Sequence, residues 1–221
     1  MIDLEKDGDV FVLHMRDGEN RFNDRFLEAF HRALDEVESS EGPAALVTCG
    51  EGKFYSNGLD LAWFGGEGAG RATQVLANLD ALFARLLCFP VATVAALNGH
   101  AFAGGGMLAM AHDFRVMRRD RGFFCLPEID LAMGQPLSDG MYAVLQTRLT
   151  QSALSEMLVT GSRYGGSEAA ARGIVDEAVP ESEVLPRAVA RMAGLAGKDR
   201  ATMTALKRGL HREALAVLER S

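Results

Sequence analysis

The amino-acid sequence predicts an α/β protein whose first half alternates β-strands with α-helices and whose second half is mainly helical. In residues 10–117, short apolar runs alternate with segments whose apolar residues recur at helical spacing. Strands that alternate with helices in this way are expected to be parallel and joined by right-handed crossovers. From about residue 137 onward the pattern is mainly helical.

The expected elements follow from periodicity and from residues that suit their boundaries. Asn23 suits the N-cap of the first helix, because the apolar residues after it recur every three or four positions. A glycine triplet at 104–106 opens a short apolar helix. The remaining expected strands are 10–15, 44–49, 91–97 and 114–117, and the remaining expected helices lie over about 72–87, 137–149, 151–160, 167–173, 181–196 and 199–219.

Composition narrows the class of protein. A chain of 221 residues is long enough for one substantial core, and its 48% apolar and 24% charged residues are ordinary for a globular protein. The net charge of −7 argues against nucleic acid as the main partner, because phosphate binding requires a basic surface.

Cysteine usage and the lack of targeting signals favour the cytoplasm. Cys49, Cys88 and Cys125 are odd in number and form no C-x-x-C pair, as expected of reduced residues in a cytosolic core. No apolar run reaches the roughly 18–20 residues that span a membrane. The first residues are acidic and lack a secretory signal, and the last carry no peroxisomal tripeptide of the S-K-L type.

Two glycine-containing sites follow apolar runs that we expect to be strands. One reads GKFYSNGLDLAW at residues 52–63, and the other reads NGHAFAGGGMLAM at residues 98–110. Glycines at a helix N-terminus leave backbone N–H groups free to stabilise negative charge on a substrate oxygen. Their missing Cβ atoms also let a ligand approach the main chain closely. Tight packing of a helix on a sheet is the structural alternative.

Two further segments complete a series of four motifs. LPEIDL occupies residues 126–131, and AAARGIVD occupies residues 169–176. Over about residues 45–180, the four motifs in this order resemble the crotonase (enoyl-CoA hydratase/isomerase) superfamily. The sequences of the two glycine sites are especially similar to those of Δ3,Δ2-enoyl-CoA isomerases of the plant peroxisomal type. Ala132 departs from the pattern, because glycine is common there in the family.

The resemblance implies a crotonase (ClpP-like) spiral of ββα units with a C-terminal helical region. Residues 1–180 would form the spiral core with the CoA-thioester site, and residues 181–221 would form helices for oligomerisation and pocket closure. The family assembles as homotrimers or dimers of trimers. The implied partner is an acyl-CoA small molecule rather than nucleic acid or a membrane, with no separate cofactor because coenzyme A is part of the substrate.

The resemblance also implies an oxyanion hole made by the main chain. In the family, two backbone N–H groups bind the thioester carbonyl and stabilise the enolate that forms when a C2 proton is removed. Matched position by position, these donors are those of Leu59 and Gly104. Each such donor is worth roughly 3–4 kcal/mol in the transition state.

The side chains that face the acyl group distinguish the reactions of the family. Hydratases carry two glutamates, and the first of these positions is occupied here by Met107, which cannot activate water. The second is Glu128. One carboxylate and an oxyanion hole suit a double-bond shift in which Glu128 moves a proton from C2 to C4. Phe123, Phe124 and Leu126 suggest an apolar pocket, which would raise the pKa of this carboxyl group.

The remaining candidate residues have weaker assignments. Asp60 is expected to shape the first loop, Asp130 lies two residues from Glu128 and so on the opposite face, and Asp139 is expected to be a helix N-cap. His100 and His112 lack partners at metal-ligand spacing, and Ser56 lies outside a G-x-S-x-G elbow, so neither a metal site nor a serine triad is expected. The expected substrate-binding residues are Ser56, Asn57, Gly58, Asp60, Trp63, Gly105 and Met107. Trp63, Phe64 and Tyr142 are expected along the acyl chain. Lys207 and Arg208 are expected either near the CoA phosphates or on a solvated helix face.

We therefore expect an enzyme that converts 3-enoyl-CoA to trans-2-enoyl-CoA and so feeds unsaturated fatty acids into β-oxidation. Two alternatives remain open. One keeps the fold and changes the reaction, to hydration or to hydrolysis of the thioester. The other is a non-catalytic family member that binds acyl-CoA, against which the retained Glu128 and both glycine sites argue.

Overall fold

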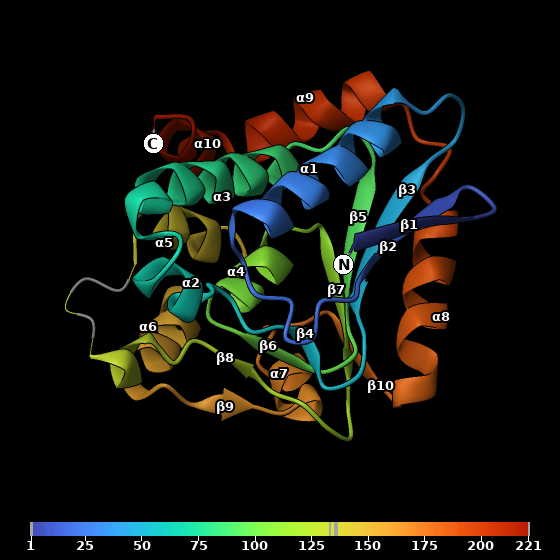
Figure 1. Ribbon diagram of the computed structural model, residues 1–221. Coiled ribbons are helices and arrows are strands. Elements are labelled where there is room, and N and C mark those ends of the chain that lie inside the picture. Colours follow the sequence, from blue (N-terminus) through green and yellow to red (C-terminus); the bar gives the residue numbers. More distant parts are fainter. Residues whose placement is uncertain (1, 133, 135–136, 221) are drawn as a thin grey trace.

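The fold contains a six-stranded β-sheet covered by helices on both faces and a smaller four-stranded sheet (Figure 1). The computed structural model describes residues 2–132, 134 and 137–220. The large sheet has the order β1 (Ile2–Asp7), β2 (Val10–Met15), β3 (Ala45–Gly50), β5 (Ala92–Leu97), β7 (Phe114–Arg118), β10 (Glu177–Val179). All its neighbours from β2 onward are parallel, as predicted. The antiparallel strand β1 was not expected.

The small sheet positions the motifs. Its strands are β4 (Phe54–Ser56), β6 (His100–Phe102), β8 (Phe124–Cys125) and β9 (Arg163–Tyr164). Strands β4, β6 and β8 each come directly after a strand of the large sheet, and they are parallel to one another. The chain therefore passes three times from the large sheet to the small one, and the next element each time is a helix or a 3-10 turn. This is the expected repetition of ββα units.

The helices agree with the predicted ones except for α2, which lies where a loop was expected, and near the C-terminus. They are α1 (Asp24–Ser39), α2 (Leu61–Gly65), α3 (Ala72–Leu87), α4 (Gly104–Met110), α5 (Asp139–Gln146), α6 (Gln151–Thr160), α7 (Gly166–Ala171), α8 (Glu181–Ala193), α9 (Arg200–Leu210) and α10 (Arg212–Leu218). Asn23 caps α1 as predicted, since its side chain accepts a hydrogen bond from the Phe26 N–H. The single helix expected over 199–219 is wrong, because the chain turns at His211 and α10 packs against α3 and α5.

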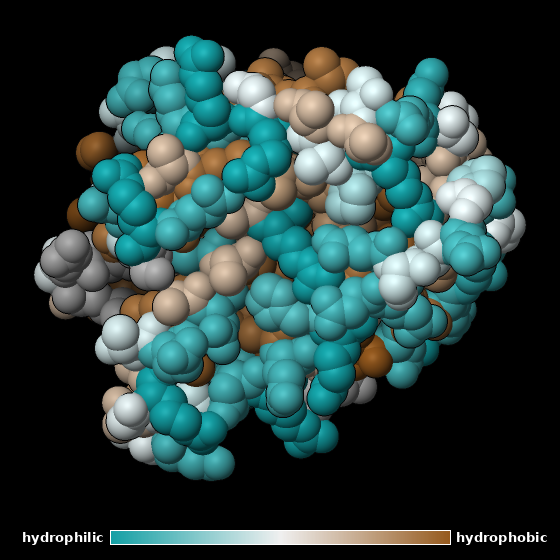
Figure 2. All heavy atoms as spheres, turned by 90° about the horizontal axis from the view of Figure 1, so that it is seen from above, coloured by the Kyte–Doolittle hydropathy of each residue, from teal (hydrophilic) through white to brown (hydrophobic). Residues whose placement is uncertain are grey.

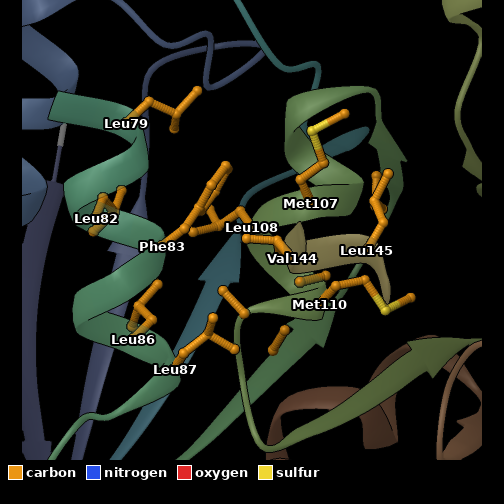
Figure 3. Packing of buried hydrophobic residues seen from close by; sticks show 14 of the residues in the cluster. Leu79, Leu82, Phe83, Leu86, Leu87, Met107, Leu108, Met110, Val144 and Leu145 are labelled. Carbon is orange, nitrogen blue, oxygen red and sulfur yellow. The ribbon is translucent and has the colours of Figure 1, made fainter. Parts of the chain in front are cut away.

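Alternate residues of the large sheet enter two separate apolar clusters. In β2, Val10 and Val12 pack on the face that α8 covers, whereas Phe11 and Leu13 point to the opposite cluster. This period of two follows from the pleat of a strand that is buried on both faces. On the second face, apolar side chains of α3, α4 and α5 interlock, among them Phe83, Leu108 and Val144 (Figure 3). That cluster includes the buried apolar side chains of the glycine-triplet helix, α4.

The C-terminal helices contribute to the same two clusters. Val184, Ala188 and Met192 of α8 join the first, and Leu215 and Leu218 of α10 join the second.

The face of the molecule seen from above is mostly hydrophilic (Figure 2). In the described part of the chain, no helix is both long and apolar enough to cross a membrane.

Candidate active site

The loop after β4 is fixed by hydrogen bonds to the segment that follows β2. The Ser56 hydroxyl donates to the Asn20 carbonyl at 2.7 Å, and the Gly58 N–H donates to the Ser56 hydroxyl oxygen at 3.2 Å. The Phe22 N–H donates to the Gly58 carbonyl at 2.8 Å, and the Asp60 N–H donates to the Phe22 carbonyl at 3.0 Å. These hydrogen bonds involve Gly58 and Asp60, the neighbours of Leu59, and leave the Leu59 N–H unused.

Side chains around the two glycine sites have supporting roles. Ser56 is fully buried, and the Asp60 carboxylate caps α2 by accepting from the Trp63 N–H at 3.1 Å, so Asp60 shapes this loop as predicted. Asn98 joins the two sites, since its side-chain amide donates to the Gly52 carbonyl at 3.2 Å. A Cβ at Gly105 would lie 2.2 Å from the Ser56 carbonyl oxygen, which shows how closely the triplet approaches the β4 strand.

The N-terminus of α4 meets this loop directly. A Cβ at Gly58, which has φ +75°, would lie 2.8 Å from the backbone nitrogen of Gly104. In the part of the chain that the structure describes, neither the Leu59 N–H nor the Gly104 N–H donates to a protein acceptor. Both residues line one cavity of about 230 Å³. The structure thus brings the two predicted donors together.

Glu128, from the LPEIDL motif at residues 126–131, lines the same cavity. It is the first residue of a 3-10 turn, Glu128–Leu131, that follows β8. Glu128 is only 5% exposed. Its Oε2 atom is buried and has no hydrogen-bond partner among the described residues. Burial raises the pKa of this carboxyl group to about 7, against a smaller lowering by its own backbone N–H. A carboxyl group of this kind can exchange a proton near neutral pH.

The rest of the cavity is largely apolar. Met107 and Asn57, two of the expected substrate-binding residues, line it together with Leu137 and Met141 of the α5 region. Phe124 and Leu126 are fully buried and contact the helix at Gly106 rather than the cavity. The expectation that Phe123, Phe124 and Leu126 form this pocket is wrong, because none of them is among the residues that line it, and Phe123 is 38% exposed and packs on His100.

Arg21 is a lining residue that the sequence did not reveal. Its guanidinium pairs with the Glu19 carboxylate at 2.6 Å, and Glu19 also accepts from the Asn57 side-chain amide at 2.7 Å. These contacts hold the pKa of Glu19 below its usual value, with the Asn57 hydrogen bond as the largest cause. The signal was weak, because Arg21 lies in a short polar segment far from both glycine sites in sequence.

Several predicted residues lie elsewhere. Trp63 is not among the residues that line the cavity; its indole folds over Gly68, where a Cβ would come within 2.2 Å, and faces Arg71. Asp130 is exposed and lies against Gly161. Asp139 is exposed and is the first residue of α5, so the N-cap prediction is wrong by one position: the Ser138 hydroxyl accepts from the Met141 N–H at 3.2 Å.

Neither alternative expected for Lys207, a contact with the CoA phosphates or a place on a solvated helix face, agrees with the structure. Lys207 is 5% exposed, and its ammonium group donates to the Asp113 carboxylate at 2.6 Å and to the Val91 carbonyl at 2.8 Å. Its stem enters the core because α9 lies over the start of β5. Arg208 is half exposed and pairs with Glu219 at 2.9 Å.

His112 has a structural role. His112 is fully buried, with one ring nitrogen 3.0 Å from the Thr48 hydroxyl and the other 2.8 Å from the Leu108 carbonyl. Burial lowers its pKa to about 4, so the ring is neutral at physiological pH. Among the described residues, no group of three or more His, Cys, Asp or Glu side chains is arranged to hold a metal ion.

Comparison with proteins of known sequence agrees with this geometry. Residues 5–221 match the sequence profile described as enoyl-CoA hydratase/isomerase. The chain is 39% identical over 191 residues to enoyl-CoA delta isomerase 2, peroxisomal, of Arabidopsis thaliana, covering 83% of this chain and 79% of that one. It is likewise 39% identical over 188 residues to enoyl-CoA delta isomerase 3 of the same plant, covering 82% and 78%.

Solved structures lead to the same family. A structure described as an enoyl-CoA isomerase of Mycobacterium tuberculosis superposes with a TM-score of 0.90 at 26% identity, covering 99% of this chain and 94% of that one. One described as a probable enoyl-CoA hydratase of the same organism gives the same TM-score and identity, with 99% and 91% covered. An enoyl-CoA hydratase of Mycobacterium marinum gives a TM-score of 0.89 at 28% identity, with 99% and 94% covered. The predicted crotonase fold is thereby confirmed, and the chain belongs to the enoyl-CoA hydratase/isomerase family.

Proposed function

We propose that the protein is a Δ3,Δ2-enoyl-CoA isomerase, an enzyme that moves a C3=C4 double bond of an acyl-CoA to C2=C3. The observation that carries this proposal is the pairing of one buried carboxylate, Glu128, with the N–H groups of Leu59 and Gly104 in one cavity. Met107 lines that cavity where a hydratase would place its other glutamate. The plant delta isomerases to which the chain is 39% identical support the same reaction.

In the proposed mechanism, the thioester carbonyl oxygen accepts hydrogen bonds from the Leu59 and Gly104 N–H groups. The Glu128 carboxylate removes a proton from C2, and the electron pair of that C–H bond forms an enolate with its charge on the oxygen. The enolate then collapses, the C2=C3 bond forms, and the electrons of the former C3=C4 bond take the proton back at C4 from the Glu128 carboxyl group. The carboxylate is regenerated, so no other reactant is consumed. Each N–H donor is expected to contribute roughly 3–4 kcal/mol to the transition state.

Met107 supports isomerisation over hydration. Adding water across a double bond in this family commonly uses two cooperating carboxylates, and a thioether can neither deprotonate nor orient water as a carboxylate does. The apolar side chains of Met107, Leu137 and Met141 also disfavour a bound water beside the reacting carbons.

An absorbance assay with 3-hexenoyl-CoA and, separately, trans-2-hexenoyl-CoA tests the proposal. We expect the wild-type protein to form the conjugated 2-enoyl product from the first substrate, and Glu128→Gln to lose that activity. Normal turnover by Glu128→Gln would show that another group is the base. Loss of the 2-enoyl signal from the second substrate would indicate hydration, whereas binding without turnover of either would indicate an acyl-CoA-binding protein.

The remaining expectations stay predictions. Coenzyme A would enter as part of the substrate, with no separate cofactor, and the reaction would serve β-oxidation of unsaturated fatty acids. The homotrimer is expected from the family, and mass measurement in solution would test it. The cytoplasm also stays an expectation, and two of the plant relatives are described as peroxisomal.

A further inference from the structure

Three buried polar side chains join the elements that carry the two glycine sites, and the mechanism above does not use them. The Tyr55 hydroxyl lies 2.8 Å from the Thr48 hydroxyl, which lies 3.0 Å from one ring nitrogen of His112. The other ring nitrogen lies 2.8 Å from the Leu108 carbonyl oxygen. Tyr55, Thr48 and His112, which we refer to as the buried triad, are all fully buried. Buried polar groups are costly unless they are paired, so the folded state has to keep these hydrogen bonds.

One arrangement of protons satisfies all three hydrogen bonds. A carbonyl oxygen can only accept, so the His112 nitrogen beside Leu108 carries a proton. Burial lowers the pKa of His112 to about 4, so the ring is neutral near pH 7 and its second nitrogen accepts from the Thr48 hydroxyl. The Thr48 hydroxyl has only one proton, so the Tyr55 hydroxyl donates to the Thr48 oxygen. The hydrogen bonds therefore all run in one direction, from Tyr55 to Leu108.

The triad connects the two proposed oxyanion donors through the backbone. Tyr55 belongs to β4, and the loop that contains Leu59 follows this strand directly. Leu108 lies about one turn after Gly104 in α4. Thr48, on β3 of the large sheet, is hydrogen-bonded on both sides. One series of hydrogen bonds thus links the strand before the first donor to the helix that begins with the second.

We propose that the buried triad consists of positioning residues that fix the separation of the two proposed oxyanion donors. The inference rests on the proposed isomerase function, because the role it assigns is in forming the enolate. None of the three side chains is among the residues that line the catalytic cavity, so they act on the reaction only through the backbone. Donors that are held in place before the reaction stabilise an enolate oxygen most effectively, and a small shift of either donor weakens that stabilisation.

Three variants of the triad test this role with 3-hexenoyl-CoA as the substrate. Tyr55→Phe removes one hydroxyl and leaves the hydrogen bond between Thr48 and His112 in place. Thr48→Val removes the central hydroxyl and leaves both neighbours without that partner, whereas Thr48→Ser keeps the hydroxyl. We expect kcat to fall about three- to tenfold in Tyr55→Phe and at least about tenfold in Thr48→Val, and to stay within about twofold in Thr48→Ser. KM should stay within about threefold, because the donors bind the enolate oxygen more strongly than the ground-state carbonyl oxygen.

Tyr164→Phe is the matched control for Tyr55→Phe. Tyr164 is 2% exposed and lies on β9 of the same small sheet, and its hydroxyl interacts with the Glu156 side chain of α6. Loss of this buried hydroxyl should lower stability without changing kcat by more than about twofold. An equal loss of kcat in the two tyrosine variants would show that the triad acts only through general stability, which overturns the proposal. This pair of variants also decides the question if Thr48→Val does not fold.

The absorbance of bound 2,4-hexadienoyl-CoA gives a readout that stability alone does not move. In this conjugated thioester C2 is already part of a double bond, so Glu128 has no acidic C2 proton to remove. Hydrogen bonds to the carbonyl oxygen polarise the conjugated system and shift its absorbance to longer wavelength. We expect the full shift in the wild-type protein, Thr48→Ser and Tyr164→Phe, and a smaller one in Tyr55→Phe and Thr48→Val. A loss of kcat with an undiminished shift would overturn the proposal.

Failure of this inference is distinguishable from failure of the proposed function. If the wild-type protein neither isomerises 3-hexenoyl-CoA nor shifts the absorbance of the dienoyl thioester, the function itself is wrong. If it isomerises the substrate and the triad variants behave like Tyr164→Phe, only the role of the triad is wrong. Isomerisation without any shift in the wild-type protein would show that the donors do not polarise the carbonyl group, which also overturns the proposal.

The pH profile separates an effect on the donors from an effect on the base. Glu128 is not part of the triad, so the rising limb of kcat/KM should stay near about pH 7 in Tyr55→Phe. A limb that moves in Tyr55→Phe but not in Tyr164→Phe would show that the triad acts on the carboxyl group instead of the two donors, and would overturn the proposal.

Discussion

Gly58 and Gly104 lie so close that a Cβ on Gly58 would be 2.8 Å from the Gly104 backbone nitrogen. Gly58 also has φ +75°, a backbone conformation that residues other than glycine rarely adopt. The same close approach positions the Leu59 and Gly104 N–H groups beside one cavity. The geometry of the proposed oxyanion hole therefore depends on a position that tolerates no side chain.

Gly58→Ala is expected to lower kcat for 3-hexenoyl-CoA by at least about a hundredfold, because the methyl group must push the two donors apart. Gly52→Ala is the matched control. Gly52 has φ +66°, but among the described residues no atom lies within 4 Å of the place its methyl group would take, so this variant carries the backbone strain without the clash. Both variants should lose about 1 kcal/mol or more of stability in urea unfolding. Equal activity in the two variants would show that the contact does not serve catalysis.

The pH dependence of turnover should follow Glu128. Burial raises the pKa of its carboxyl group to about 7, and the base must be ionised to remove the C2 proton. We expect kcat/KM for 3-hexenoyl-CoA to rise with pH through about 7 and then level off. A profile that is already flat from about pH 5 upward would mean that the base has an ordinary carboxyl pKa and is not Glu128.

The same carboxyl group should make the folded state less stable as pH rises. Its pKa is raised from 4.5 to about 7 in the folded protein, so between these values the folded state binds more protons than the unfolded state, and the free energy of unfolding falls as pH rises. Glu128→Gln removes this effect. The difference in unfolding free energy between variant and wild type should be smallest near pH 4.5 and should grow, in favour of the variant, by up to about 3 kcal/mol at alkaline pH. Urea unfolding at several pH values measures it, and a difference that does not vary with pH would contradict the burial of this carboxylate.

The long elements could be predicted from the sequence, whereas the small sheet could not. Helices α1 and α3 show four or more turns of regular apolar spacing, and β3 and β5 are continuous apolar runs, so periodicity locates them. Strands β4, β6 and β8 are two or three residues long, which is too short for any period to appear. They exist because they pair with one another inside motifs that the sequence shows only as loops.

The residues of the candidate site were predicted from sequence motifs rather than from hydrophobic periodicity. Leu59, Gly104 and Glu128 were located by resemblance, and the structure places all three on one cavity. Arg21 was missed because its position depends on hydrogen bonds between segments about 35 residues apart, such as the one from the Asn20 side chain to the Tyr55 carbonyl. No local pattern encodes such a contact.

Lys207 shows why charge alone misleads. On an amphipathic helix a lysine resembles a solvated or phosphate-binding residue, and only the fold shows that Asp113 lies beneath it. Lys207→Met is expected to cost about 1–3 kcal/mol of stability, because it removes the nearer of two cations from the partly buried Asp113 carboxylate, leaving Arg148 at 3.7 Å, together with the hydrogen bond to the Val91 carbonyl. The double variant with Asp113→Asn should recover part of that loss.

Arg208→Met is the control for this prediction. Arg208 pairs with Glu219 on the surface, and an exposed ion pair is worth about 0–1 kcal/mol. Chemical unfolding of the four proteins measures these differences, and the KM for 3-enoyl-CoA should be unchanged in every variant that folds. A raised KM with unchanged stability in Lys207→Met would instead support a contact with the substrate.

Met107→Glu tests how the single-carboxylate arrangement sets the chemistry. Met107 is 1% exposed and shares its cavity with Glu128, so a second carboxylate there places two like charges in a mainly apolar space. Two such groups cannot both ionise easily, and one pKa rises. The rising limb of the isomerase pH profile should therefore move above about 7 in this variant and stay near about 7 in Met107→Gln, which has the same size without the charge. Profiles of kcat/KM for 3-hexenoyl-CoA measure the shift, and a parallel assay on trans-2-hexenoyl-CoA shows whether the added carboxylate brings hydration. An unchanged limb in Met107→Glu would mean that the side chain at this position does not face Glu128 during the reaction.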